Sequence, residues 1–283
     1  MNFCAVVVLY NQSLFESYSY MTFLKDRCDI KVFIYDNSLT PQHSLEELER
    51  YGYIYYHDSS NSGLGKAYNW AVNMALDYKC DWIFLLDQDT KFPPLAWEKY
   101  VSAVIAYKDI KLFAPKHKIH IGDRKYFSPT RRFMKQSILL KKVITGIISL
   151  KSYSPINSGM LINISAFLES GGYDERIYLD FSDFQFIEKF SKLYSLFGVV
   201  DVVCEQNFSN NDVEKEKLLN RFALYCNCAR LCKKSGLIDR MCYCILVLRR
   251  SISLFFRLRT FQVFRILYHK YILFFLINCL MSL

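Results

Sequence analysis

A short buried strand that ends in two carboxylates is the most constraining feature of the chain. Five consecutive apolar residues run from Trp82 to Leu86, too few for a helix and rich in the aromatic and branched side chains of a strand buried on both faces. Asp87 and Asp89 follow at once, and Pro93 marks a loop. Because α/β sheets bind ligands at the carboxyl ends of their strands, we expect these aspartates at the ligand-binding edge of a parallel sheet.

The two aspartates favour a cation site. Carboxylates held one residue apart repel each other unless positive charge lies beside them. Mg²⁺ and Mn²⁺ prefer hard oxygen ligands, and Mg²⁺ commonly combines few carboxylates with substrate phosphates. Asp87 and Asp89 therefore predict a phosphorylated ligand held through Mg²⁺ or Mn²⁺, with a solvated acidic turn as the alternative.

Three more apolar runs precede this strand. Residues 3–9, 31–35 and 53–56 are predicted strands, separated by segments of helical length. Polar residues follow the first two runs, at Asn11 and Asp36. Successive strand–helix units with polar residues at one edge predict a parallel α/β sheet with helices on its faces.

A glycine-containing loop, residues 61–66, stands before a predicted helix whose apolar residues repeat at helical spacing to Tyr78. The N–H groups of the helix start, together with Lys66, would face a phosphate; an ordinary helix start with a solvated lysine is the alternative. Dinucleotide binding is disfavoured because no glycine follows the first strand and Tyr68 stands where the third glycine is needed. No P-loop motif occurs either.

The last segment of the chain is basic and apolar. Residues 237–283 carry seven Lys or Arg residues against one acid, Asp239, and so hold most of the net charge of +9. Arginines interrupt the apolar runs before any reaches the ~18 residues of a spanning helix. We therefore divide the chain into a domain of residues 1–236 and an amphipathic helical tail on an anionic membrane surface. The alternative is a helical layer packed on the domain.

Residues 116–150 are basic and poorly periodic, which predicts a mobile loop over the site or at the membrane. Nucleic-acid binding is disfavoured because no stacking platform or recognised module accompanies the charge. Met1 leads into the first strand without a secretory signal, so we expect a cytoplasmic domain with reduced thiols. The cysteines between 226 and 244 lack paired C-x-x-C spacing, and we interpret them as apolar helix residues rather than a zinc site.

Two further aspartates, Asp180 and Asp183, fall near the start of a helix predicted to run to about Leu196. Asp180 fits the role of a helix cap. Asp183 is then free to point into a cleft.

Four motifs carry a family resemblance. They are Leu9-Tyr10-Asn11, Tyr35-Asp36-Asn37-Ser38, the segment 61–69, and Leu85-Leu86-Asp87-Gln88-Asp89-Thr90, in this order. Together they resemble the family 2 inverting glycosyltransferases of GT-A fold, above all the bacterial rhamnosyltransferase-like members that assemble O-antigen and capsule. The resemblance spans roughly residues 3–235 and implies a mostly parallel central sheet flanked by helices.

The resemblance also implies roles for individual residues. Asp36 would contact the nucleotide base, Asp87 would lie by the ribose, and Asp89 would ligate the metal, with Asp87 as a further ligand. Asp183 would be the catalytic base, with Asp180 as the second choice. The residues implied to bind the nucleotide sugar are Tyr10, Asn11, Asp36, Asn61, Gly63, Lys66, Asn69 and Asp87.

The implied reaction moves a sugar from a nucleoside diphosphate to a lipid-linked glycan on the inner face of the bacterial membrane. It needs a cation on the leaving diphosphate and a base on the acceptor hydroxyl. The Asp-Gln-Asp form favours rhamnose and a dTDP donor, with UDP-linked hexoses open. Two departures from the family pattern are Gln185 in place of an acid and the lack of a histidine at 203–207, where Glu205 is the expected substitute.

Two other functions stay open at this stage. A nucleotidyltransferase also uses carboxylates and a metal, but it should carry a Gly-, Arg- and Lys-rich loop directly after the first strand, where Tyr10-Asn11-Gln12-Ser13 stands. A non-catalytic membrane-surface scaffold built on a decayed transferase domain would account for the two departures.

Overall fold

The parallel half of the sheet is built from the four strands that the sequence predicts. The computed structural model describes residues 1–118, 125–206 and 214–273, and its centre is a twelve-stranded sheet. Strand β1 lies between β2 and β4, and β3 lies beyond β2 at the edge of the sheet. The pairings β1–β2, β1–β4 and β2–β3 are all parallel. The prediction of a parallel sheet is confirmed here for β1 (Phe3–Leu9), β2 (Lys31–Asp36), β3 (Ile54–His57) and β4 (Trp82–Asp87).

Beyond β4 the sheet is mixed. Strand β11 lies between β4 and β6 and is antiparallel to β4. The long strand β12 is parallel to β6 and antiparallel to β5 and β9. Strand direction cannot be read from a short apolar run, so the sequence did not indicate this change. The strands are β5 (Thr90–Lys91), β6 (Leu112–Lys118), β9 (Gly146–Ser149), β11 (Met160–Asn163) and β12 (Leu196–Gln206).

The prediction of a mobile loop at 116–150 is wrong over the described part of this segment. Strands β7 and β8 form an antiparallel hairpin there, and β10 pairs with β7. The buried residues of β7 are Ser128, Pro129 and Thr130 in succession, whereas Arg131 is exposed, so the strand has neither an apolar run nor an apolar–polar alternation. Residues 119–124 of the predicted loop lie outside the described residues. The strands are β7 (Tyr126–Phe133), β8 (Gln136–Leu140) and β10 (Tyr153–Ser154).

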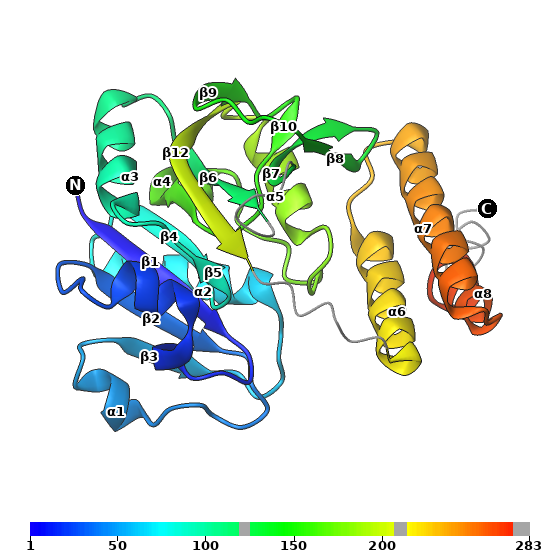
Figure 1. Cartoon of the computed structure of the whole chain (residues 1–283), viewed down its shortest axis with the longest axis horizontal. Helices are drawn as coiled ribbons and strands as arrows, with labels where there is room; N and C mark the ends of the chain where they lie inside the picture. The colour runs from blue at the N-terminus through cyan, green and yellow to red at the C-terminus, as the bar shows by residue number, and fades with distance from the viewer. Residues whose placement is uncertain (119–124, 207–213, 274–283) are drawn as a thin grey trace.

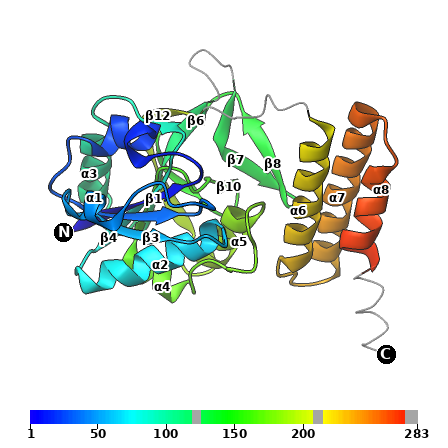
Figure 2. The same ribbon diagram turned by 90° about the horizontal axis from the view of Figure 1, so that it is seen from below.

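Helices cover both faces of the sheet (Figure 2). Helices α2, α4 and α5 contribute to the hydrophobic cluster on one face, and α1, α3, η1 and η2 to the cluster on the other. The segment of helical length after the first strand instead forms two short helical elements, because Ser17 bonds back to the Leu14 carbonyl and competes with a continuous helix. Their bounds are η1 (Leu14–Glu16), η2 (Tyr20–Leu24), α1 (Leu45–Glu49), α2 (Leu64–Asp77), α3 (Ala96–Ala106), α4 (Ile164–Glu169) and α5 (Ser182–Phe190).

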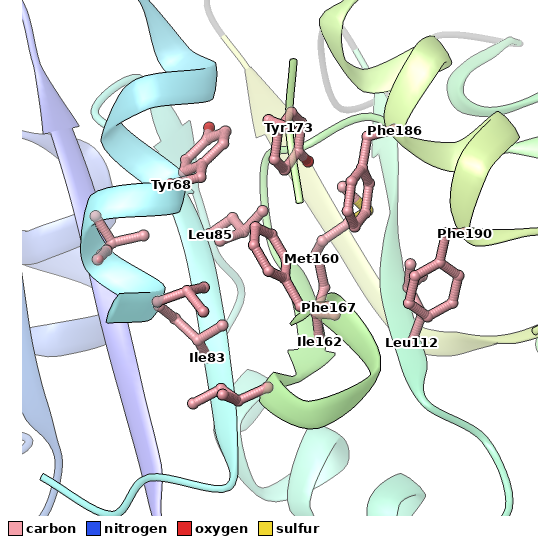
Figure 3. Packing of buried hydrophobic residues seen from close by; sticks show 14 of the residues in the cluster. Tyr68, Ile83, Leu85, Leu112, Met160, Ile162, Phe167, Tyr173, Phe186 and Phe190 are labelled. Atoms are coloured by element: carbon pink, nitrogen blue, oxygen red, sulfur yellow. The ribbon is translucent and has the colours of Figure 1, made fainter. Parts of the chain in front are cut away.

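Aromatic packing links these helices to the strand ends (Figure 3). Tyr173 stacks on Phe186 of α5 with ring centroids 4.3 Å apart, and Tyr68 of α2 lies 5.2 Å from Tyr173. The Tyr68 hydroxyl then donates to Asp87 at the end of β4. The core therefore positions one of the two carboxylates directly.

The C-terminal helices form a bundle beside the sheet (Figure 1). Their shared cluster joins Phe222 of α6 to Val247 of α7 and Val263 of α8, and it contains three buried cysteines and the half-buried Cys244 as free thiols. The predicted boundary at 236–237 falls at the start of α7, inside this bundle. Within the described residues no helix is long and apolar enough to cross a membrane. The helices are α6 (Lys215–Leu231), α7 (Leu237–Leu258), α8 (Gln262–Leu267) and η3 (Tyr268–Ile272).

Candidate active site

A cavity of about 530 Å³ opens at the carboxyl ends of β1 and β4, and we call it the donor cavity. The structure brings five of the predicted residues together in its lining. It adds five polar residues that the sequence analysis did not single out as site residues. The predicted residues are Tyr10, Asn61, Gly63, Asp87 and Asp89, and the added ones are Gln12, Asn37, Gln88, Tyr178 and Gln206.

The two strand ends are tied to each other. The Tyr10 N–H donates to Gln88 Oε1 at 2.7 Å, and Gln88 Nε2 donates to the Tyr10 carbonyl at 3.2 Å. The Tyr10 side chain stays about half exposed, at 53%, and is thus available to a ligand. Asn11 follows with a φ of +51° and donates its N–H to Ser38 Oγ at 2.7 Å. Its place is in the turn after β1, outside the described lining.

Only glycine fits at position 63. Its φ is +93°, and a Cβ there would lie 2.3 Å from the Tyr178 carbonyl oxygen. Asn61 also has a positive φ, +49°, and its N–H donates to the Asp58 carbonyl at 3.0 Å. The Asp58 side chain accepts from the Tyr35 hydroxyl at 2.7 Å. This loop is therefore preformed against the sheet.

Lys66 and Asn69 lie on α2, outside the described lining of the donor cavity. Lys66 Nζ donates to Ser62 Oγ at 3.2 Å. Asn69 accepts from the Tyr173 N–H at 2.9 Å and donates to the Tyr173 carbonyl and to Glu175. Asn69 thus fastens the turn before α5 to α2, and the predicted nucleotide contacts of Lys66 and Asn69 stay predictions.

Asp36 is fully buried and holds the turn after β2. Its carboxylate accepts from the N–H groups of Ser38 and Gln42 at 2.9 and 2.8 Å and from the Tyr55 hydroxyl at 2.6 Å. Burial raises the pKa of Asp36, but these hydrogen bonds outweigh it and leave the pKa below its usual value. Its neighbour Asn37 lines the cavity, with an Oδ1 that is buried and lacks a hydrogen-bond partner among the described residues.

The two carboxylates after β4 are electrostatically strained. Burial, followed by the charges of Asp89 and Asp183, raises the pKa of Asp87 to about 7 against the hydrogen bond that Tyr68 donates at 3.0 Å. Burial also raises the pKa of Asp89, although Gln206 Nε2 donates to Asp89 Oδ1 at 2.9 Å. A cation in this cavity would relieve both groups.

Within the described residues, no group of three or more His, Cys, Asp and Glu is placed to hold a metal ion. The structure places an amide beside Asp89. Gln206 lies at the end of β12 and lines the cavity, and its Oε1 is buried without a hydrogen-bond partner among the residues described. Neighbouring strand residues point to opposite faces, and the described lining includes Gln206 but not the expected substitute, Glu205. Asp89 and Gln206 offer the oxygen ligands that Mg²⁺ and Mn²⁺ accept.

A second cavity, of about 590 Å³, contains Asp183, and we call it the acceptor-side cavity. Burial raises the pKa of Asp183 to about 6; the hydrogen bond from the Phe184 N–H at 2.7 Å opposes this shift and the charge of Asp180 adds to it. The charge of Asp183 in turn raises the pKa of Asp87. The two carboxylates are also linked through packing, because Tyr68 donates to Asp87 and lies against Tyr173, which stacks on Phe186 of α5, the helix that carries Asp183.

Asp180 is held in an ion pair. Both of its oxygens accept from the guanidinium of Arg221 on α6. The expectation that Asp180 caps the helix is wrong, since Phe181 occupies the cap position of α5, with a φ of +68°. With the Asp180 carboxylate engaged by Arg221, Asp183 is the aspartate that faces the acceptor-side cavity.

Gln185, one of the departures from the family pattern, has a structural role. Its Nε2 donates to the Tyr243 hydroxyl at 2.9 Å, and its Oε1 accepts from the Lys233 N–H at 3.0 Å. The residue thereby joins α5 to α7 and to the segment before α7.

Solved structures place the fold in a known class. TarS of S. aureus (residues 1–349) superimposes with a TM-score of 0.51 at 15% identity, over 89% of this chain and 72% of that one. GalNAc-T7, solved with UDP, GalNAc and Mn²⁺, gives a TM-score of 0.56 at 12% identity, over 95% of this chain and 58% of its own. The protein has a GT-A type glycosyltransferase fold, as the resemblance predicted.

The sequence match is more specific. Residues 6–168, more than half of the chain, match glycosyl transferase family 2, and the chain belongs to that family. It is also 26% identical over 185 residues to the dTDP-rhamnosyl transferase RfbF of Shigella flexneri. That match covers 64% of this chain and spans about 60% of the curated relative's length. The expectation of a rhamnosyltransferase-like family 2 member is confirmed.

Proposed function

We propose that the protein transfers a sugar, with rhamnose as the first candidate, from a dTDP- or UDP-linked donor to a lipid-linked glycan in bacterial surface polysaccharide synthesis, such as that of O-antigen or capsule. One observation carries this proposal: Tyr68, which donates to Asp87 of the donor cavity, packs through Tyr173 onto Phe186 of α5, the helix that brings Asp183 into the acceptor-side cavity. A donor held on one side and a base on the other permit a direct displacement.

The donor cavity supplies contacts for the nucleotide. Asn37 Oδ1, buried and unpartnered among the described residues, is an acceptor for the ring N–H that uracil and thymine both carry. The half-exposed Tyr10 ring offers a surface for the base. Asp36 holds the turn that presents Asn37 and so acts on the base through its neighbour. Asp87 is assigned to the ribose side.

Asp89 and Gln206 would hold a divalent cation, with Asp87 beside them. Bound there, Mg²⁺ or Mn²⁺ would neutralise charge on the leaving diphosphate. Among the chain's own groups, the buried Gln206 amide orients the Asp89 carboxylate.

Asp183 would act as the base. A pKa near 6 leaves it ionised at neutral pH yet more basic than an ordinary aspartate. It would accept the proton of the acceptor hydroxyl while that oxygen attacks the anomeric carbon and the diphosphate leaves from the opposite face. One displacement without a covalent intermediate inverts the configuration at that carbon.

The tail would hold the enzyme peripherally on the inner face of the bacterial cell membrane. Helix α7 exposes a row of apolar side chains, and exposed arginines flank it. Apolar groups that enter the interface beside basic groups that meet anionic headgroups favour surface binding. The row, called the apolar stripe below, consists of Met241, Ile245, Leu248, Ile252 and Phe256.

The test is nucleotide release by the purified protein from a panel of dTDP-, UDP- and GDP-sugars, with Mn²⁺, with Mg²⁺ and with chelator. We expect metal-dependent release from one donor class, with loss in Asp89→Ala and retention in Asp77→Ala, the same change at an exposed carboxylate of α2. No nucleotide release from any donor, even with a lipid extract as acceptor, would contradict the proposal and favour the non-catalytic scaffold. Release of diphosphate from a nucleoside triphosphate would favour a nucleotidyltransferase instead.

A further inference from the structure

The acceptor-side cavity has a basic wall that the reaction outlined above does not use. Besides Asp183 it is lined by Lys135 of the β7–β8 hairpin connection and by Arg249 and Arg250 of α7. The cavity thus joins a candidate base to a helix of the C-terminal bundle, more than sixty positions along the chain from Asp183. A neutral glycan would not require this much positive charge beside a base.

The charges in this wall are not equivalent. Lys135 is neutralised by Glu188 at 2.5 Å and by Asp239 at 3.2 Å. Arg249 donates to the neutral Gln136 amide oxygen at 2.9 Å. Arg250 lies over the Tyr225 ring, 4.1 Å from its centroid. Across the residues that the structure describes, neither arginine has an ion-pair partner, so two guanidinium groups remain for an anion.

We propose that Arg249 and Arg250 bind a phosphate group of the acceptor, whose sugar hydroxyl then reaches Asp183. Guanidinium groups present paired N–H donors that match phosphate oxygens and form charge-assisted hydrogen bonds. The contact of Arg250 with Tyr225 holds that side chain in place by a cation–π interaction, which lowers the entropic cost of binding. This inference rests on the proposed function, because it assigns the acceptor class of the same site.

The layout of α7 favours a phosphate that belongs to a lipid. Leu246, Arg249, Arg250 and Ser253 line the cavity at helical spacing. The apolar stripe residues Ile245, Leu248, Ile252 and Phe256 recur on the neighbouring face and are exposed. A lipid tail on that stripe would leave its phosphate beside the two arginines and its sugar toward Asp183.

Binding of farnesyl diphosphate, inorganic diphosphate and farnesol to the full chain tests the proposal, measured calorimetrically with chelator present so that metal-dependent binding in the donor cavity is absent. The variants are Arg249→Gln with Arg250→Gln, Arg249→Gln alone, and Arg257→Gln. Arg257 is exposed on the same helix and outside the described cavity lining, which makes it the matched control. Unchanged thermal midpoints show that each variant is folded.

We expect the wild type and Arg257→Gln to bind farnesyl diphosphate equally, and the double variant to bind it at least about tenfold more weakly, since charged hydrogen bonds are lost. If the wild type binds inorganic diphosphate more weakly than farnesyl diphosphate, the phosphate is assigned to a lipid. If it binds both equally, the result supports the anion site without a lipid contribution. If the double variant does not fold, Arg249→Gln alone decides, with a smaller loss expected. The inference is overturned if all folded variants bind farnesyl diphosphate with the wild-type affinity, or if the wild type binds farnesol as tightly as farnesyl diphosphate.

The donor panel with wild-type protein separates the two failures. Arginine-dependent binding without nucleotide release from any donor would remove the proposed function and leave the anion site. Nucleotide release together with farnesyl diphosphate binding that does not depend on either arginine would support the proposed function and remove the anion site.

Discussion

The donor cavity and the acceptor-side cavity are built in different ways. The first is made mainly by strand ends and tight turns between residues 8 and 89, and Tyr178, Leu179, Gln206 and Leu224 from later in the chain complete its lining. The second is made by a hairpin, one turn of α5 and the middle of α7, which lie far apart in the sequence. Most of the donor cavity's lining falls within residues 6–168, the segment that matches the family, whereas the acceptor-side cavity depends more on residues beyond that segment, in α5, α6 and α7.

The largest expected effect is on the transfer rate, when the base in the acceptor-side cavity is removed. Asp183→Asn removes the base but keeps the size and the shape of the side chain. Because general base catalysis contributes about 10²–10⁴-fold, we expect the transfer rate to fall by that factor. Single-turnover transfer at saturating donor measures it, and a variant that transfers at the wild-type rate would break the assignment.

The next effect concerns the cation. Gln206→Ala removes the amide that bonds to Asp89 and the unpartnered buried oxygen beside it. Loss of a metal ligand or of its orienting partner typically costs about 10–100-fold in metal affinity, so the Mn²⁺ dissociation constant should rise by that factor. Electron paramagnetic resonance of free Mn²⁺ measures it without turnover. Gln12→Ala, another glutamine in the same cavity, is the control and should change little.

The pH dependence should report the acceptor-side cavity. The pKa of Asp183 is raised to about 6 and its ionised form is the active one, so kcat/KM should fall as the pH drops through 6, by about tenfold per unit below it. The rate is measured from pH 5 to 8, with metal and donor saturation checked at each point because burial also raises the pKa of Asp87 and Asp89. A flat profile down to pH 5 would refute the assignment.

The smallest effect sharpens the comparison between the cavities. Gln185→Ala removes the hydrogen bonds that join α5 to Tyr243 and Lys233, at a cost of about 1–3 kcal/mol of unfolding free energy for the polar partners left buried. Denaturant unfolding measures this cost, with the exposed Gln262→Ala on α8 as control. The acceptor KM should rise while the nucleotide dissociation constant stays constant; a change in nucleotide binding alone would contradict the account.

Sequence reasoning reached the donor side because its signals are local. The run from Trp82 to Leu86 and the two aspartates after it predicted β4 and the place of these aspartates at its end. Gly63 was expected only in a phosphate-facing loop, and the structure adds its close approach to Tyr178. The same reasoning passed over Asn37, although it lies in one of the motifs, because an aspartate stands beside it. Only the structure shows that Asp36 is buried in backbone hydrogen bonds while Asn37 faces the cavity.

The acceptor side escaped prediction for physical reasons. Strand β7 buries Ser128, Pro129 and Thr130 instead of large apolar residues, so its sequence carries no hydrophobic pattern typical of a strand. Arg249 and Arg250 were interpreted as membrane-facing charges, since nothing in the sequence shows that α7 returns to the sheet domain. Gln206 was missed because the search was for a histidine or an acid, and its register is set by pairing with Thr90 of β5.

The most direct test of the central claim is calorimetric binding of dTDP and UDP, with Mn²⁺ present, to Asp183→Asn and Asp89→Ala side by side. The account places donor binding in one cavity and the base in the other, so it predicts that Asp183→Asn binds nucleotide like the wild type and that Asp89→Ala loses metal-dependent binding. Loss of nucleotide binding in Asp183→Asn, or metal-dependent binding retained in Asp89→Ala, would contradict it.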